Sequence, residues 1–166
     1  MHRLEGVPQS SIGAPLPLVL ADESTALVAF CLENRDQSWD GSTVRVVDPV
    51  TSEEPIGIVR FTRCYSISFG PPNDDAFSGH PLAARGLEPY GAFRIEQSSW
   101  LLELERRNSV HPRHDRDDFL RRKQHLILTF HDSIVEWIAE SFDVSYERGS
   151  LHSVLPVMLS FLRTAA

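Results

Sequence analysis

The chain has 166 residues, of which 42% are hydrophobic, 23% charged and 9% aromatic. These proportions are typical of a folded globular domain and exclude a disordered, collagen-like or coiled-coil protein. With 16 basic and 23 acidic side chains the net charge is −7, which argues against nucleic acid and anionic lipid as partners. A chain of this length can bury enough apolar surface for one core, so we expect a single α+β domain over residues 16–166.

Residues 1–15 contain proline, serine and glycine without periodicity, which predicts a flexible N-terminal arm. The arm lacks the pattern of a signal peptide, and no run approaches the roughly 18 apolar residues of a membrane span. Cys31 and Cys64 have no metal-ligand spacing and are expected as buried thiols. These features together predict a cytoplasmic protein.

The first half of the domain predicts β-structure. Residues 25–32 and 43–47 are rich in β-branched and apolar side chains, and residues 57–69 alternate apolar with polar side chains throughout. We expect three strands, the last with one core face and one polar face. Residues 70–89 are rich in proline and glycine, which predicts a long irregular loop of the kind that often covers a binding site.

Two helices are predicted after a short strand at residues 93–96. Ser98 or Ser99 offers an N-cap for a helix through Trp100, with a continued strand as the alternative. Asp115 is predicted to cap the next helix, which has acidic residues in its first turn and basic residues at its end.

The C-terminal third predicts a hairpin followed by a helix. The runs 125–131 and 134–142 flank Asp132-Ser133 as the turn, with the second run helical in the alternative reading. Apolar residues recur at helical spacing over 151–162. We therefore predict an α+β fold with a mainly antiparallel sheet, as a roll or half-open barrel, with two or three short helices and a C-terminal amphipathic helix.

No sequence motif identifies a reaction. The glycine-rich nucleotide loops, the nucleophile elbow of α/β-hydrolases, the zinc-protease helix motif and the EF-hand loop are all missing from the sequence. Seven histidines are present. Those at predicted loops or strand ends, where scaffolds tend to place functional groups, are His80, His111, His114 and His131.

The predicted hairpin gives its two strand faces different characters. With the turn at residues 132–133, one face is purely apolar, and the other carries, among isoleucines, His125, Thr129, His131 and Glu136. Glu136 is then diagonal to His131, roughly 7–8 Å away between Cα atoms. His125 is about 20 Å from His131 along the same strand, which leaves it outside that site.

This polar face, covered by the 70–89 loop, suggests a small His/carboxylate enzyme. His131 or His80 would act as general base, polarised by Glu136 or Asp132. An arginine would hold a small anionic ligand, and the candidates are Arg60, Arg63 and Arg113. The candidate catalytic residues are thus His131, Glu136 and His80.

A metal site is the second reading of the histidines. His111, His114 and a carboxylate such as Asp132, with His131 or Glu136 as further donors, would suit Zn²⁺, Fe²⁺ or Mn²⁺. Pro112 biases His111 toward an extended conformation, so the two histidines of HPRH are not ligands on one helix face. In the alternative interpretation, these histidines and carboxylates only stabilise local structure.

The function expected first is that of a binding or protein-interaction domain, with the enzyme as the alternative. An acidic domain of this size could cover a basic surface on a protein partner, using the 70–89 loop and Trp39 as contacts. Nucleic-acid binding through residues 106–123 is disfavoured because the basic residues there are interspersed with acidic ones.

Overall fold

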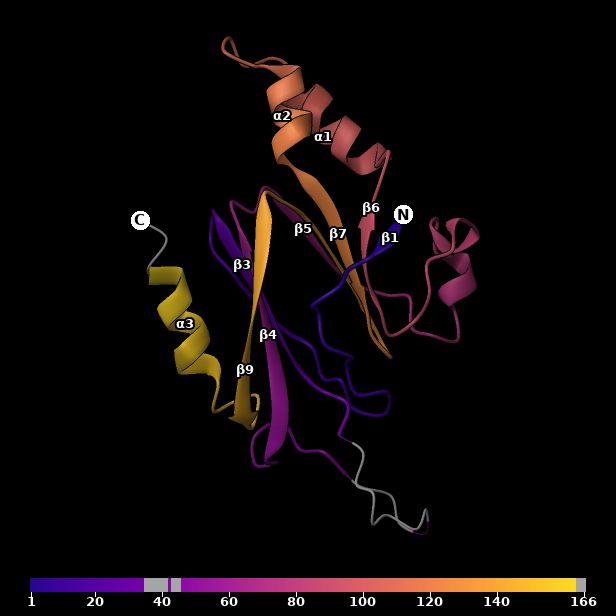
Figure 1. Cartoon of the computed structure of the whole chain (residues 1–166), viewed down its shortest axis with the longest axis vertical. Coiled ribbons are helices and arrows are strands. Elements are labelled where there is room, and N and C mark those ends of the chain that lie inside the picture. Colours follow the sequence, from indigo (N-terminus) through magenta and orange to yellow (C-terminus); the bar gives the residue numbers. More distant parts are fainter. Residues whose placement is uncertain (35–41, 43–45, 164–166) are drawn as a thin grey trace.

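The computed structural model describes residues 1–34, 42 and 46–163. Within them the chain forms two antiparallel sheets and three helices, which confirms the predicted α+β fold (Figure 1). The five-stranded sheet has the order β1-β6-β7-β8-β5. Its strands are β1 (His2–Arg3), β5 (Ser66–Gly70), β6 (Ala92–Ile95), β7 (Gln124–Thr129) and β8 (Ile134–Ala139).

The four-stranded sheet has the order β2-β3-β4-β9. Its strands are β2 (Leu18–Ala21), β3 (Thr25–Cys31), β4 (Glu54–Thr62) and β9 (Ser141–Gly149). The helices are α1 (Ser99–Asn108), α2 (Arg116–Arg122) and α3 (Leu155–Arg163), and the 70–89 loop contains the short turns η1 (Phe77–Gly79) and η2 (Ala83–Arg85).

The main core lies between the two sheets. Phe30 of β3 and Phe61 of β4 face Leu128 of β7 and Trp137 of β8, and all four side chains are buried. Trp137 stacks on Phe61 with ring centroids 4.0 Å apart. Because alternate residues of β7 and β8 supply this face, the purely apolar face predicted for the hairpin is confirmed.

Both sheets are also covered on their outer faces. Met158 of α3 and Val154, just before the helix, pack onto the outer face of β3 and β4. On the five-stranded sheet, Phe77 and Leu87 of the 70–89 loop pack against the outer side chains of β6, β7 and β8. Helices α1 and α2 lie together at one end of that sheet (Figure 1). The β7–β8 hairpin is therefore buried on both sides.

The single strand predicted for residues 57–69 is wrong. The chain leaves β4 at Thr62, turns at Arg63, which has a left-handed φ of 51°, and enters the other sheet as β5. Phe61 and Ile67 both face the core between the sheets. Because each strand buries one face on that shared core, the alternation of apolar and polar residues continues across the turn and conceals it.

The hairpin turn lies one residue earlier than predicted. The Phe130 N–H donates to the Ser133 carbonyl at 2.8 Å, so the turn residues are His131 and Asp132. Placing the turn one residue earlier shifts the partner of each residue on the opposite strand by two positions. Every side chain therefore stays on the same face of the sheet but has a new cross-strand neighbour. Glu136 pairs with Ile127.

Both predicted helix caps are confirmed. The Ser98 side chain accepts the Leu101 N–H at the start of α1, and the Asp115 side chain accepts the Asp118 N–H at the start of α2. Strand β9 was not predicted, because most of its residues are exposed or only half-buried and carry little apolar signal. The strand predicted for residues 43–47 falls largely outside the described residues.

The segment predicted as an arm contacts both sheets. Residues of β1 pair with β6, with His2 opposite Arg94, and Ser10 forms an isolated bridge with Leu32 beside β3. Leu4 and Val7 pack against the core between the sheets. None of the helices in the described part of the chain combines the length and apolar character that crossing a bilayer requires.

Trp137→Ala should lower the free energy of unfolding by about 3–5 kcal/mol, because it removes the largest side chain of the core between the sheets. Urea unfolding followed by circular dichroism measures this loss. Tyr146→Ala is the matched control, since the Tyr146 side chain is 60% exposed on β9 and its removal should change stability by no more than about 0.5 kcal/mol. Equal losses in the two variants would contradict this account of the core.

Candidate functional site

A cleft of about 340 Å³ lies on the outer face of the five-stranded sheet, between the 70–89 loop and the start of α1. Seven of the eleven residues that line it are polar or charged and four are apolar. The lining residues are Ser68, His80, Pro81, Leu82, Arg85, Ile95, Ser98, Ser99, Trp100, His125 and Glu136.

Glu136 and His125 meet because they are diagonal neighbours on β8 and β7. Glu136 pairs with Ile127 on β7, and His125 lies two residues before Ile127 on the same face. The His125 Nε2 atom is 2.7 Å from Oε2 of Glu136. The His125 side chain is only 4% exposed, whereas that of Glu136 is 21% exposed. The carboxylate is therefore the more accessible member of the pair.

Ser98 extends this hydrogen-bond chain on the other side of the imidazole. Its Oγ is 2.7 Å from the His125 Nδ1 atom, although the two residues are 27 positions apart in sequence. The same Oγ accepts the N–H of Leu101 at 3.0 Å as the cap of α1. Because an ionised carboxylate can only accept, the ring proton of neutral His125 lies on Nε2 facing Glu136, and Nδ1 is left to accept the Ser98 hydroxyl proton.

The 70–89 loop supplies a second imidazole. The His80 Nδ1 atom accepts the N–H of Leu82 at 3.2 Å, which places the ring proton of neutral His80 on Nε2. That Nε2 lies 3.8 Å from Oε1 of Glu136, the oxygen that His125 does not contact. Glu136 thus has one imidazole facing each of its two carboxylate oxygens.

Trp100 and Arg85 also line the cleft. The Trp100 ring meets His125 edge to face, with centroids 5.1 Å apart and planes at 78°. The exposed Arg85 side chain donates from Nη2 to the Glu96 carbonyl at 2.8 Å. Its guanidinium adds a positive charge at the opening, where it can pair with an anionic group. The cluster can therefore hold an anion and exchange a proton at Glu136.

Of the three predicted catalytic residues, the structure brings His80 and Glu136 together at the cleft and places His131 at the hairpin turn. The expectation that His125 lies outside the site is wrong. Moving the turn by one residue makes His125, rather than His131, the diagonal neighbour of Glu136. The cleft lies on the polar sheet face beneath the 70–89 loop, and its lining includes His125 rather than His131.

His131 instead helps to join the loop to the hairpin turn. Its Nδ1 is 3.2 Å from Oδ1 of Asp132 and 3.6 Å from Oδ1 of Asp74. The Asp74 N–H donates to the His131 carbonyl at 2.8 Å. Tyr90, at the end of the loop, donates its hydroxyl to Asp74, and burial together with that carboxylate raises the pKa of Tyr90 to about 12.

The predicted metal-ligand residues are not gathered in one place. His114 Nε2 is 2.8 Å from Oε1 of Glu105, and His111 Nδ1 accepts the N–H of Arg113, so both serve the connection between α1 and α2. Asp132 lies beyond the opposite end of β7, at least about 20 Å along the strand direction. Among the described residues, no group of three or more His, Cys, Asp or Glu side chains is arranged to hold a metal ion.

The arginines predicted to hold an anionic ligand lie away from the cleft. Arg60 pairs with Asp143 at 2.9 Å on the four-stranded sheet, and Arg63 lies 3.7 Å from a glutamate carboxylate at the end of β8. Arg113 lines a polar hollow beside His111 instead. The structure places Arg85 at the cleft in their stead, and this residue was not singled out from the sequence.

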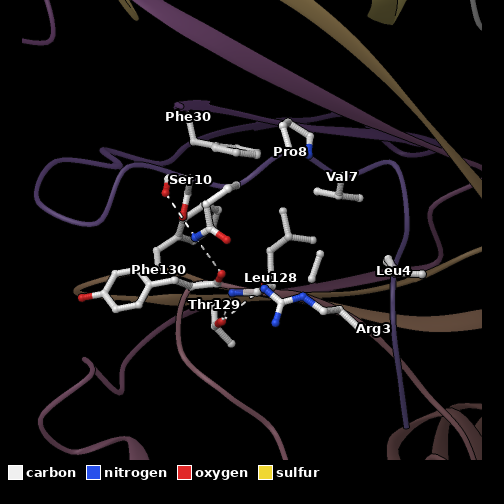
Figure 2. A pocket seen from close by; sticks show the side chains of 13 residues that line it. Arg3, Leu4, Val7, Pro8, Ser10, Phe30, Leu128, Thr129 and Phe130 are labelled. Atoms are coloured by element: carbon white, nitrogen blue, oxygen red, sulfur yellow. Dashed lines mark hydrogen bonds between the residues drawn. The ribbon is translucent and has the colours of Figure 1, made fainter. Parts of the chain in front are cut away.

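A second cavity lies where the N-terminal segment passes between the sheets (Figure 2). It is lined by residues that include Val7, Ser10, Phe30 and Leu128. Its volume of about 30 Å³ is close to that of one water molecule, which excludes it as a site for a larger ligand.

Comparison with known proteins identifies no relative. No protein-family model matches the chain, and no curated protein or solved structure resembles it significantly. The function is therefore argued from the site itself.

Sequence reasoning missed Ser98, Trp100, Arg85 and His125 as neighbours of one cleft. Ser98 carried only the signal of a helix cap, which it is. Arg85 is one of many arginines, and nothing local distinguishes it. The one usable signal in the sequence was that His125 and Glu136 share a strand face. With the turn placed one residue earlier, this pattern predicts that the two side chains are neighbours.

Tyr90→Phe should raise the pKa of Asp74 toward its ordinary value, because the hydrogen bond from Tyr90 is the main cause that lowers it. The lowered pKa of Asp74 adds stability to the folded protein above about pH 4. This stability is lost as the pH falls through the pKa that Asp74 has in the folded state. Carbon-detected NMR titration of the carboxyl groups measures the change. Asp48 is the control, since backbone N–H groups of its own turn lower its pKa. A shift of Asp48 equal to that of Asp74 would contradict this local explanation.

Proposed function

We propose that the protein is an enzyme that binds a small anionic molecule in the cleft and exchanges a proton with it through Glu136, His125 and His80. The observation that carries this proposal is the partly exposed Glu136 carboxylate with an almost fully buried imidazole facing each of its oxygens. Imidazole and carboxylate groups that share a proton network beside a cleft are the usual parts of general acid–base catalysis.

Each group has a separate role in this proposal. Glu136, as the accessible member, meets the ligand, while His125 and His80 orient the carboxylate and stabilise its charge. Arg85 pairs with the anionic group of the ligand, and Trp100 forms an apolar wall beside His125. The two cysteines are thiols without a disulfide, which agrees with action in a reducing cytoplasm.

Glu136→Gln should weaken ligand binding at the cleft roughly 10- to 100-fold, because a charge-assisted hydrogen bond is replaced by a neutral one. The measurement is an NMR titration of the Trp100 indole signal with a panel of small hydroxy, amino and ester derivatives of carboxylic acids. The wild-type protein should bind at least one compound with a Kd below about 1 mM, which corresponds to roughly 4 kcal/mol.

The matched control for this experiment is Glu147→Gln on β9, whose side chain is exposed and does not line the cleft. It should bind the same compound as well as the wild-type protein does. Equal affinity in the wild-type and Glu136→Gln proteins, or a wild-type protein whose Trp100 signal responds to none of the compounds, would count against the proposal.

As a second candidate function, we propose that the protein is an interaction domain that binds a protein partner. Its support is an apolar groove of about 540 Å³ beside the end of β5, bordered by Val50 and Phe69, whose side chains are more than half exposed. The net charge of −7 favours a basic protein as the partner. Trp39, the other predicted contact, lies outside the described residues. Phe69→Ser should abolish such a complex and leave ligand binding at the cleft unchanged.

A further inference from the structure

Ser98, His125 and Glu136 form a continuous relay at one wall of the cleft. The hydroxyl oxygen of Ser98 and the carboxylate oxygen Oε2 of Glu136 are each 2.7 Å from opposite nitrogens of the same imidazole. A nucleophile, a base and a carboxylate that orients the base form the arrangement that activates a serine, and this arrangement is defined by geometry rather than by sequence order.

We propose that Ser98 is a nucleophile and that the cleft hydrolyses a small carboxylic ester through an acyl-serine intermediate. This inference rests on the proposed function, because it uses the same cleft and the same His125–Glu136 pair. It goes further by naming a bond-forming residue and a substrate class, and in this reaction the proton passes through His125, while Glu136 acts on His125 rather than on the ester.

The proton positions suit this role. Because the Glu136 carboxylate accepts from Nε2 of neutral His125, the Nδ1 atom carries no proton and can accept that of Ser98, whose oxygen also accepts the Leu101 N–H. The Nε2–H of His125 then faces Glu136, whose negative charge stabilises the imidazolium that forms when His125 takes up the serine proton. The nitrogen that contacts the serine here is Nδ1, whereas the more familiar serine triads use Nε2.

The start of α1 supplies donors for the developing negative charge. The first intrahelical bond of α1 runs from the Leu102 N–H to the Ser98 carbonyl at 3.1 Å, so the N–H groups of Ser99 and Trp100 precede it and have no acceptor within the helix. Both residues line the cleft beside Ser98. A backbone N–H directly after the nucleophile is the position from which α/β-hydrolases stabilise an oxyanion.

The reaction balances with water as the only co-reactant. Ser98 Oγ forms a bond to the ester carbonyl carbon while its proton moves to His125, and the bond to the alcohol oxygen breaks as that oxygen takes the proton. Water then attacks the acyl-serine, gives a proton to His125, and releases the carboxylic acid while the serine oxygen recovers the proton. One ester and one water become one acid and one alcohol.

The direct test is reaction of the 166-residue chain with diisopropyl fluorophosphate, followed by intact-mass and peptide mass spectrometry. We expect one diisopropylphosphoryl group per chain, attached to Ser98, with fluoride as the leaving group. His125→Gln keeps the serine and the helix cap but removes the base, and should slow the labelling roughly 100- to 10,000-fold.

Ser109→Ala is the matched control, since it removes an exposed serine at the other end of the same helix and should leave the labelling rate unchanged. The site of labelling in the wild-type protein decides the question even if a Ser98 variant folds poorly for want of its cap. Circular dichroism confirms that His125→Gln is folded before its rate is compared.

The outcomes separate this inference from the proposed function. Labelling at Ser98 that depends on His125 supports the nucleophile. An unlabelled Ser98, or a rate that is the same in His125→Gln, overturns it, even where the carboxylate panel still binds in a way that depends on Glu136. The proposed function would then stand as acid–base chemistry without a covalent intermediate.

Discussion

The burial of the β7–β8 hairpin on both of its faces is the constraint on which the rest of the structure depends. Its inner face forms the core with the four-stranded sheet, where Trp137 stacks on Phe61. Its outer face is covered by the 70–89 loop and by the start of α1. Polar side chains on that outer face lose their contact with water, so each must find a hydrogen-bond partner within the protein.

The Ser98–His125–Glu136 chain meets this requirement. His125 is almost fully buried and has one partner at each ring nitrogen. A cluster that served only to satisfy buried groups would have no need to open onto a cleft. Here Glu136 is partly exposed, and a cation, an aromatic ring and the first N–H groups of a helix surround the same space. This combination is the observation on which the proposed function rests.

The 70–89 loop has two tasks, and different residues perform them. Phe77 and Leu87 anchor it on the sheet through apolar contacts, and the contacts of Asp74 and Tyr90 join it to the hairpin turn. Between these anchors His80 reaches Glu136. A loop held at both of its ends can position a histidine, which a freely moving loop could not do with the same accuracy.

The sequence alone determined those features that depend on neighbouring residues. The caps Ser98 and Asp115, the two faces of the hairpin, the C-terminal helix and the α+β class all follow from local periodicity and hydrogen-bonding chemistry, and the structure has them. Only the tertiary structure decided where β4 ends and β5 begins. Both strands present one apolar face to a single core, so the alternation of apolar and polar residues continues through the turn without a break. It also decided which histidine meets Glu136. Placing the turn at residues 131–132 or 132–133 leaves the same side chains on each face, so hydrophobic patterning cannot distinguish the two registers, whereas the packing of both sheets selects one.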